Sequence, residues 1–129
     1  MSILIKRAYE PPADSDGYRV LIDRLWPRGV RKDAARIDVW AKDLAPSTEL
    51  RAWFGHDPVR WDEFRRRYAR ELRAPAAAAL LDDLTRRARR GTVTLVYAAK
   101  DAEHSNAAAL RSRIARRLRG VAPASARRG

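Results

Sequence analysis

The chain has 129 residues, which suits a single domain able to bury about two thirds of the surface that its unfolded form would expose. It contains no cysteine, which excludes disulfides, thiol catalysis and cysteine-ligated zinc. No segment has the apolar core of a signal peptide or the roughly 20 apolar residues of a membrane span. We therefore expect a cytoplasmic protein without membrane contact.

The net charge of +12 has two explanations. A basic chain is typical of nucleic-acid binding, and seven arginines follow the last acidic residue, Glu103. The basic residues are, however, 24 arginines against four lysines, beside 24 alanines, which is also the bias of a GC-rich genome. The charge alone does not separate a functional basic surface from this codon bias.

Four segments have the composition of strands, at residues 2–8, 20–25, 37–41 and 92–98. The second contains the nearly continuous apolar run Val20-Leu21-Ile22, which is typical of a strand covered on both faces. This run favours a parallel sheet sandwiched between helices.

Helices are expected between the third and fourth strands and after the fourth. Ser47 and Asp57-Pro58 have the residue types that begin helices, and Pro75 opens a third that ends before Gly91. The second carries an aromatic stripe, interpreted as core: Trp61, Phe64, Tyr68 and Leu72. A final helix over residues 105–119 buries Leu110, Ile114 and Leu118.

Alternating strands and helices predict one α/β domain over residues 1–119. Its sheet has about four mainly parallel strands flanked by helices, with right-handed crossovers and a helical insertion before the last strand. Residues 120–129 are expected to form a disordered basic tail.

Three polar loops follow predicted strands, and in parallel α/β sheets ligands bind beyond the carboxyl ends of the strands. We therefore expect the loops to share one rim. Their candidate ligand-binding residues are Arg24, Trp26, Arg28, Gly29, Lys42, Asp43, Ser47 and Asn106.

Positive charge dominates this rim and indicates an anionic small molecule as ligand. Arg24 and Arg28 can bind carboxylate or phosphate through paired N–H donors, while Lys42 and Lys100 act as point charges. For each single residue a structural alternative is open, in which Asp23, Asp43 and Asp101 pair with Arg24, Lys42 and Lys100 in a salt-bridge network, while the group as a whole favours a site.

Only two histidines are present, His56 and His104. His104 follows Asp101 closely enough for the carboxylate to orient the imidazole, which makes Lys100, Asp101 and His104 the candidate catalytic residues. His56 precedes the expected cap Asp57 and is a candidate ligand contact or a packing residue. No metal-binding motif, glycine-rich phosphate loop or nucleotide-binding fingerprint is present, so we expect no metal and no cofactor.

The sequence resembles the DUF488 family, in particular its YeaO-like branch. The resemblance rests on the segments DGYRVLIDRLWPRG, WAKDLAPS, WFGHDP and LVYAAKD, with His104 and Asn106. In the wider family the last strand often ends in a cysteine-containing segment followed by Cys-His-Arg. Tyr97 and His104-Ser105-Asn106 stand in the comparable places here, so a thiol or metal role is not implied for this chain. Tyr97 is therefore added to the candidate ligand contacts.

Two hypotheses of different class follow. The first is a small enzyme or binding domain for an anionic, phosphate- or nucleotide-like molecule, with Trp26 available to stack on a planar group. The second is a nucleic-acid-binding or regulatory protein that uses the basic final helix and tail. A third possibility is a protein whose aromatic loops form an interface.

Overall fold

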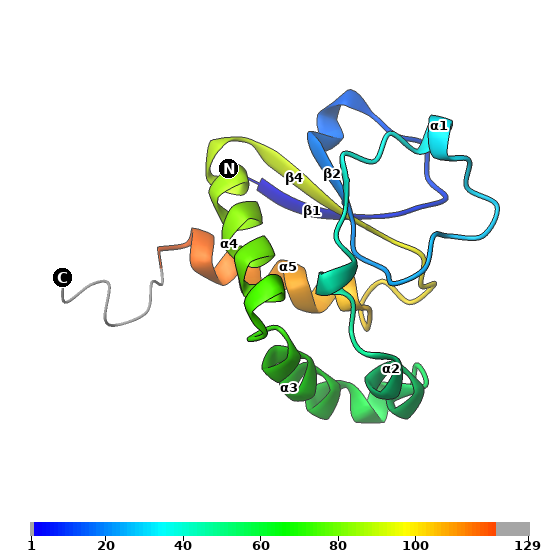
Figure 1. The fold of residues 1–129 in the computed structure, drawn as a ribbon, viewed down its shortest axis with the longest axis vertical. Helices are drawn as coiled ribbons and strands as arrows, with labels where there is room; N and C mark the ends of the chain where they lie inside the picture. Colours follow the sequence, from blue (N-terminus) through cyan, green and yellow to red (C-terminus); the bar gives the residue numbers. More distant parts are fainter. Residues whose placement is uncertain (1, 121–129) are drawn as a thin grey trace.

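The computed structural model describes residues 2–120, and its centre is a four-stranded parallel sheet in the order β1-β4-β2-β3 (Figure 1). The strands are β1 (Ser2–Arg7), β2 (Tyr18–Leu21), β3 (Val39–Trp40) and β4 (Thr92–Tyr97). Each neighbouring pair is parallel, with Ile5 and Val20 both opposite Leu95. The predicted single-domain α/β fold with a parallel sheet is confirmed.

Five α-helices accompany the sheet: α1 (Lys32–Ala35), α2 (Thr48–Phe54), α3 (Trp61–Glu71), α4 (Pro75–Arg90) and α5 (Asn106–Leu118). Three single turns of 3-10 helix complete the elements, at η1 (Asp14–Asp16), η2 (Lys42–Leu44) and η3 (Pro58–Arg60). The expected caps are present. Ser47, Asp57 and Ser105 accept hydrogen bonds from the open N–H groups of Leu50, Val59 and Ala108.

One face of the sheet carries the long helices, and the main hydrophobic core lies there. Side chains alternate along a strand, so Val93, Leu95 and Tyr97 of β4 point to the same side and are buried. They pack with Leu84 of α4 and Leu110 of α5, helices that both contact β1 and β4. In Figure 1, α4 and α5 lie on one side of the sheet, and α3 extends this helical layer beyond its edge. The aromatic stripe of α3 belongs to the same core, as predicted.

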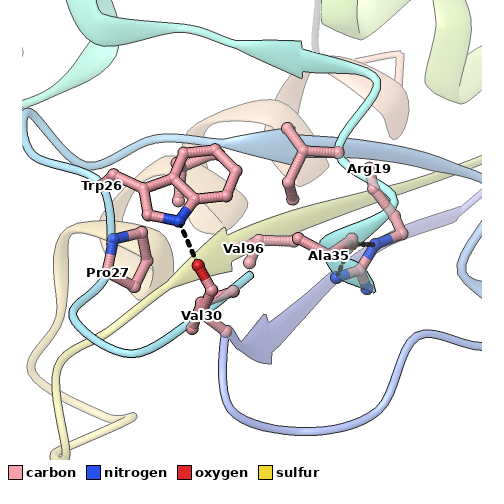
Figure 2. Close-up of a pocket in the computed structure, with 9 residues that line it drawn as sticks. Arg19, Trp26, Pro27, Val30, Ala35 and Val96 are labelled. Atoms are coloured by element: carbon pink, nitrogen blue, oxygen red, sulfur yellow. Dashed lines mark hydrogen bonds between the residues drawn. The ribbon is translucent and has the colours of Figure 1, made fainter. Parts of the chain in front are cut away.

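The other face differs from the helical layer that the apolar run of β2 predicts. It is covered by the segment of residues 22–38, whose single helical turn α1 contributes Ala35. Trp26 and Val30 of this segment lie beside Val96 of the sheet (Figure 2), and Leu21 lines the same small hollow. A loop can bury β2 as fully as a helix does, so a continuous apolar run indicates burial without identifying the covering element.

The second and third strands are shorter than expected. β2 ends at Leu21, although the N–H of Ile22 still donates to the carbonyl of Val96 at 3.1 Å. β3 is confined to Val39–Trp40. Strand pairing of this segment ends before Asp23. The carbonyl of Asp23 accepts a hydrogen bond from Trp40, and its side chain accepts one from Ala98 in the loop after β4. Of the predicted tail, residues 121–129 lie outside the described residues.

A buried arginine of β2 is paired with Asp16 and also bonds the covering segment to the sheet. Arg19 of β2 is almost fully buried, and its Nη1 lies 2.7 Å from Oδ2 of Asp16. Its Nε and Nη2 donate to the carbonyl of Ala35. Burial by itself would raise the pKa of Asp16, but the N–H of Ala13 and the cations of Lys6 and Arg19 outweigh it and lower this pKa.

We expect Arg19→Met to lower the free energy of unfolding by about 3 kcal/mol, because it leaves a buried carboxylate short of a partner and frees the Ala35 carbonyl. Urea unfolding followed by circular dichroism measures the change. Arg31→Met is the matched control, since Arg31 pairs with Asp33 at the exposed surface; its effect should stay within about 0.5 kcal/mol. Equal effects of the two substitutions would contradict the role given to Arg19.

Candidate functional site at the carboxyl edge of the sheet

All four strands are parallel, so their carboxyl ends lie along one edge of the sheet. Asp23, two residues beyond β2, joins the loops that meet there. Its Oδ2 accepts the N–H of Ala98 at 2.9 Å, and its Oδ1 accepts Nδ2 of Asn106 at 3.2 Å. Its main-chain carbonyl accepts Nε1 of Trp40 at 2.7 Å. One residue therefore connects the ends of β2, β3 and β4 with the start of α5.

The carboxyl group of Asp23 is largely withdrawn from water, and this burial raises its pKa. The hydrogen bonds from Asn106 and Ala98 and the charge of Arg51 oppose that rise. Asn106 also donates from Nδ2 to the carbonyl of Ile22 at 3.1 Å. Asn106, predicted as a ligand contact, is thus engaged in positioning the loop after β2.

The loops after β2 and β3 lie against each other. Nη2 of Arg24 is 3.4 Å from the carbonyl of Pro46, and Nζ of Lys42 lies 4.1 Å from the ring centre of Trp40. The Trp26 and Trp40 rings meet edge to face at 5.5 Å. The structure therefore brings Arg24, Trp26 and Lys42 into one region, as expected for a shared rim.

The indole of Trp26 is committed to packing. Its Nε1 donates to the carbonyl of Val30 at 2.7 Å, and its ring lines a closed hollow with Leu21 and Val96 (Figure 2). This hollow does not admit a water-sized molecule, so it is part of the packed interior. Gly29, at φ +81°, provides the left-handed turn in which the N–H of Val30 donates to the carbonyl of Pro27 at 3.3 Å.

The remaining rim cations are exposed. Arg28, Lys42 and Lys100 face solvent, as does Asp43. Within residues 2–120, Arg28, Lys42 and Lys100 do not line the closed hollow of Trp26. They also do not line a second, open hollow that lies beside α5 and includes Arg111 and Arg116. The expected rim is therefore a cationic edge whose side chains extend into solvent.

The structural alternative of a salt-bridge network at the rim is wrong for the part of the chain that the structure describes. Arg24, Arg28, Lys42 and Lys100 form no ion pair there within 4.0 Å, nor does Arg51 of α2. Asp23 bonds to Ala98 and Asn106, and Asp101 bonds to His104. Asp23 and Asp101 are thus bonded to other groups, and exposed Asp43 forms no ion pair within the described residues.

His104 and Asp101 form the pair that their spacing predicts. Nδ1 of His104 lies 2.8 Å from Oδ2 of Asp101, and this hydrogen bond lowers the pKa of Asp101. The His104 ring also meets Trp61 of α3 edge to face at 5.3 Å. The carboxylate and the indole together fix the orientation of the imidazole, while Lys100 beside them stays exposed.

His56 and Tyr97 occupy contrasting positions. His56 is exposed, has a left-handed backbone at φ +57° and lies 6.1 Å from the Phe54 ring. Tyr97 is 2% exposed at the end of β4, and its burial raises the pKa of its phenol. Of the two, only His56 is open to a ligand from solvent.

Ser47 begins α2, where we expected an external anion to bind. The anion present is the chain's own Glu71, from the end of α3. Its Oε1 accepts the N–H of Ser47 at 2.8 Å, and its Oε2 accepts the Ser47 hydroxyl at 2.5 Å. The positive end of α2 is therefore already compensated.

Sequence reasoning missed Arg51, Trp61 and Glu71 as neighbours of the site. The pattern of α3 indicated Trp61 only as a core residue, and nothing in the spacing connects Glu71 with Ser47, 24 residues earlier. Arg51 lies in the first turns of α2 and influences Asp23 through space. Such contacts arise from the packing of α2 and α3 beside the sheet edge.

A second cationic feature lies on the side of α5. It is an open hollow lined by Ile3, Arg65, Arg111, Ser112, Ala115, Arg116 and Arg119, named here the arginine hollow. No carboxylate is among these residues. Arg65 pairs with Asp62 at 2.6 Å, whereas Arg111, Arg116 and Arg119 form no ion pair with any other described residue.

Residues 2–120 contain no cluster of three or more His, Cys, Asp or Glu side chains able to hold a metal ion. Among the helices described, none is long and apolar enough to cross a membrane.

The fold and the site define a small parallel α/β domain with a cationic strand-end rim and a His-Asp pair beside it. The sequence model described as "Inactive DUF488-N3 subclade" matches residues 2–127, so the chain belongs to the DUF488 family. It is 48% identical over 108 residues to the uncharacterized protein Rv3073c of Mycobacterium tuberculosis H37Rv, covering 84% of this chain and 89% of that protein. It is 41% identical over 111 residues to the uncharacterized protein YeaO of Escherichia coli K12, covering 85% and 94%. No solved structure matches the chain.

We expect the contribution of Asp23 to the free energy of unfolding to decrease as pH rises from 3.8 through its raised pKa, because the fold favours the protonated carboxyl. The contribution is fully present below 3.8, the ordinary value, and is lost as the folded-state group ionises. Thermal unfolding of wild type and Asp23→Asn at intervals from pH 3 to pH 7 measures it. The wild type should lose stability relative to the variant as pH rises; a constant difference would contradict the shift.

Proposed function

We propose that the protein is a binding domain for an anionic, phosphate- or nucleotide-like small molecule, which it holds at the strand-end rim. We further propose that it binds without turnover, because the subclade whose sequence model it matches is described as inactive. Membership of this family is consistent with a ligand-binding fold whose chemistry has been lost. It does not identify the ligand.

One observation carries the proposal: the rim holds cations that the chain does not neutralise. Arg24, Arg28, Lys42, Arg51 and Lys100 make no ion pair within the described residues, although most other arginines on the surfaces of α3 and α4 lie beside a carboxylate. Uncompensated charges of one sign raise the local potential and attract a ligand of the opposite sign. A bound anion would neutralise the positive charge of this edge.

The side chains have complementary roles in such a complex. The guanidinium groups of Arg24 and Arg28 provide paired donors for phosphate oxygens, and Lys42 and Lys100 add charge without fixed geometry. His104, held by Asp101, and exposed His56 would contact the remainder of the ligand. Acid-base catalysis by Lys100, Asp101 and His104 stays a prediction, and the description of the subclade favours binding over catalysis.

A second candidate function, nucleic-acid binding through α5, has one observation in its favour. The arginine hollow presents several guanidinium groups on one side of the helix. Nearby, Nε of Arg113 is buried without a hydrogen-bond partner among the described residues. Burial and the charges of Arg117, Arg116 and Arg73 lower the pKa of Arg113, so positive charge is crowded here. Phosphate binding at this surface would weaken steeply with salt.

A thermal-shift titration tests the rim. Inorganic pyrophosphate and adenosine monophosphate should raise the Tm of the wild-type protein, whereas uncharged adenosine should not, because stabilisation follows from binding to the folded state. The double variant Arg28→Glu/Lys100→Glu, called the rim variant, should lose the shift. Both side chains are exposed, so the substitutions leave the core intact.

The matched control is Arg31→Glu/Arg36→Glu, which changes the charge equally at exposed positions on the segment covering the other face. It should retain the ligand-induced shift. The rim proposal fails if neither anion stabilises the wild type at millimolar concentration. It fails equally if the rim variant and the control respond alike.

A further inference from the structure

β1 is an edge strand that pairs with no strand on its outer side within residues 2–120. The N–H of Ser2 donates to the carbonyl of Gly91 at 3.0 Å, and that of Ala8 donates to Tyr97 at 2.7 Å. The direction of the main-chain N–H and C=O groups alternates along a strand, so those of the even-numbered residues point to β4. The N–H and C=O groups of Ile3 and Ile5 therefore point outward.

This edge lacks the devices that usually protect one. Exposed edges are commonly shortened, interrupted by proline or carry an outward lysine. β1 is six residues long and contains no proline, and its lysine, Lys6, is turned to Asp16 and to the Pro11 carbonyl, both at 3.0 Å. Only the last outward N–H, that of Arg7, is satisfied, by Glu10 at 3.0 Å. The carbonyl of Arg7 likewise accepts the N–H of Glu10, so the outward N–H and C=O groups of Ile3 and Ile5 remain open.

The arginine hollow lies beside this open edge, and Ile3 belongs to both. Ile3 points to the helical face of the sheet, where it packs with the core next to α5. A strand added to β1 would direct every second side chain to that same face. Those side chains would enter the hollow and meet Arg111, Arg116 and Arg119.

We propose that the β1 edge and the arginine hollow together bind an extended, acidic segment of a partner protein by strand addition. Main-chain hydrogen bonds to Ile3 and Ile5 would supply the docking energy, and carboxylates at alternate positions would neutralise the arginines. On the opposite face the segment would place apolar side chains beside Leu4, which is 44% exposed. The partner thus has alternating acidic and apolar residues.

The charges disfavour the other occupants. A second copy of the chain would bring β1 residues Ile3, Ile5 and Arg7 to the hollow, adding no negative charge and placing two arginine hollows near each other. A nucleic-acid backbone would neutralise the arginines, but its phosphates only accept hydrogen bonds. It would leave the outward carbonyls of Ile3 and Ile5 unmatched. A peptide provides both donors and acceptors at the spacing of the edge.

Fluorescence anisotropy with synthetic octapeptides tests the proposal on the full chain. The probe alternates glutamate with valine, and two further peptides carry N-methyl groups either on every glutamate or on every valine. Residues of one parity direct all their N–H groups to the same side of a strand, so only one methylated set blocks the contact with β1. One methylated peptide should bind about tenfold or more weakly, and the other should bind like the unmodified probe.

The variant Arg111→Glu/Arg116→Glu, the hollow variant, should weaken binding of the unmodified peptide by roughly tenfold. The rim variant has the same change in charge and should bind the peptide normally. Conversely, the hollow variant should keep the thermal shift with pyrophosphate, so failure of one site is distinguished from failure of the other.

Equal affinities of the two methylated peptides would overturn the proposal, because attraction by charge alone would then account for binding. No binding of the unmodified peptide at millimolar concentration would also overturn it. A single-stranded oligonucleotide of eight nucleotides is the remaining probe. If it binds more tightly than the peptide and depends on Arg111 and Arg116, the surface is a nucleic-acid site and the assignment to a protein segment is wrong.

Discussion

The strand-end rim depends on the hydrogen bonds that the carboxylate of Asp23 accepts. It lies where β2 leaves the sheet and holds the loop after β4 through Ala98 and the start of α5 through Asn106. The Asp23 carbonyl holds Trp40 at the end of β3. A carboxyl group so withdrawn from water is costly to ionise, yet its two oxygens accept hydrogen bonds from Ala98 and Asn106. These two donors belong to different segments, which the carboxylate holds together. The rim is thus arranged by a group that is not itself exposed.

Charge is distributed unevenly over the described surface. On α3 and α4, most arginines pair with Asp62, Glu63 or Asp83 of their own helix, whereas Arg89 and Arg90 form no ion pair within the described residues. At the rim and on the outer side of α5, arginines and lysines lack such neighbours. A uniform codon bias would not by itself create this contrast. A binding function is best attributed to the unpaired cations of the rim and of the arginine hollow, which form two separate surfaces.

The sequence predicts the fold well because its signals are local. The β-branched run of β4, the caps Ser47, Asp57 and Ser105 and the aromatic stripe of α3 each specify an element without reference to the rest of the chain. The spacing of Asp101 and His104 likewise predicts their pairing, because both belong to one loop. The sequence could not reveal the loop layer over Leu21, the bond from Glu71 to Ser47 or the influence of Arg51 on Asp23. Each depends on how distant segments pack, and apolar periodicity reports burial without naming the neighbour.

The sheet is asymmetric at its two margins, since β1 has six residues and β3 has two. A sheet that continues from one molecule to the next requires each molecule to have an edge strand on both sides that can pair. A two-residue margin provides too few main-chain groups to accept another strand. Any complex built on β1 therefore stops after a single addition, which gives a stoichiometry of one to one and keeps an open edge from leading to fibres.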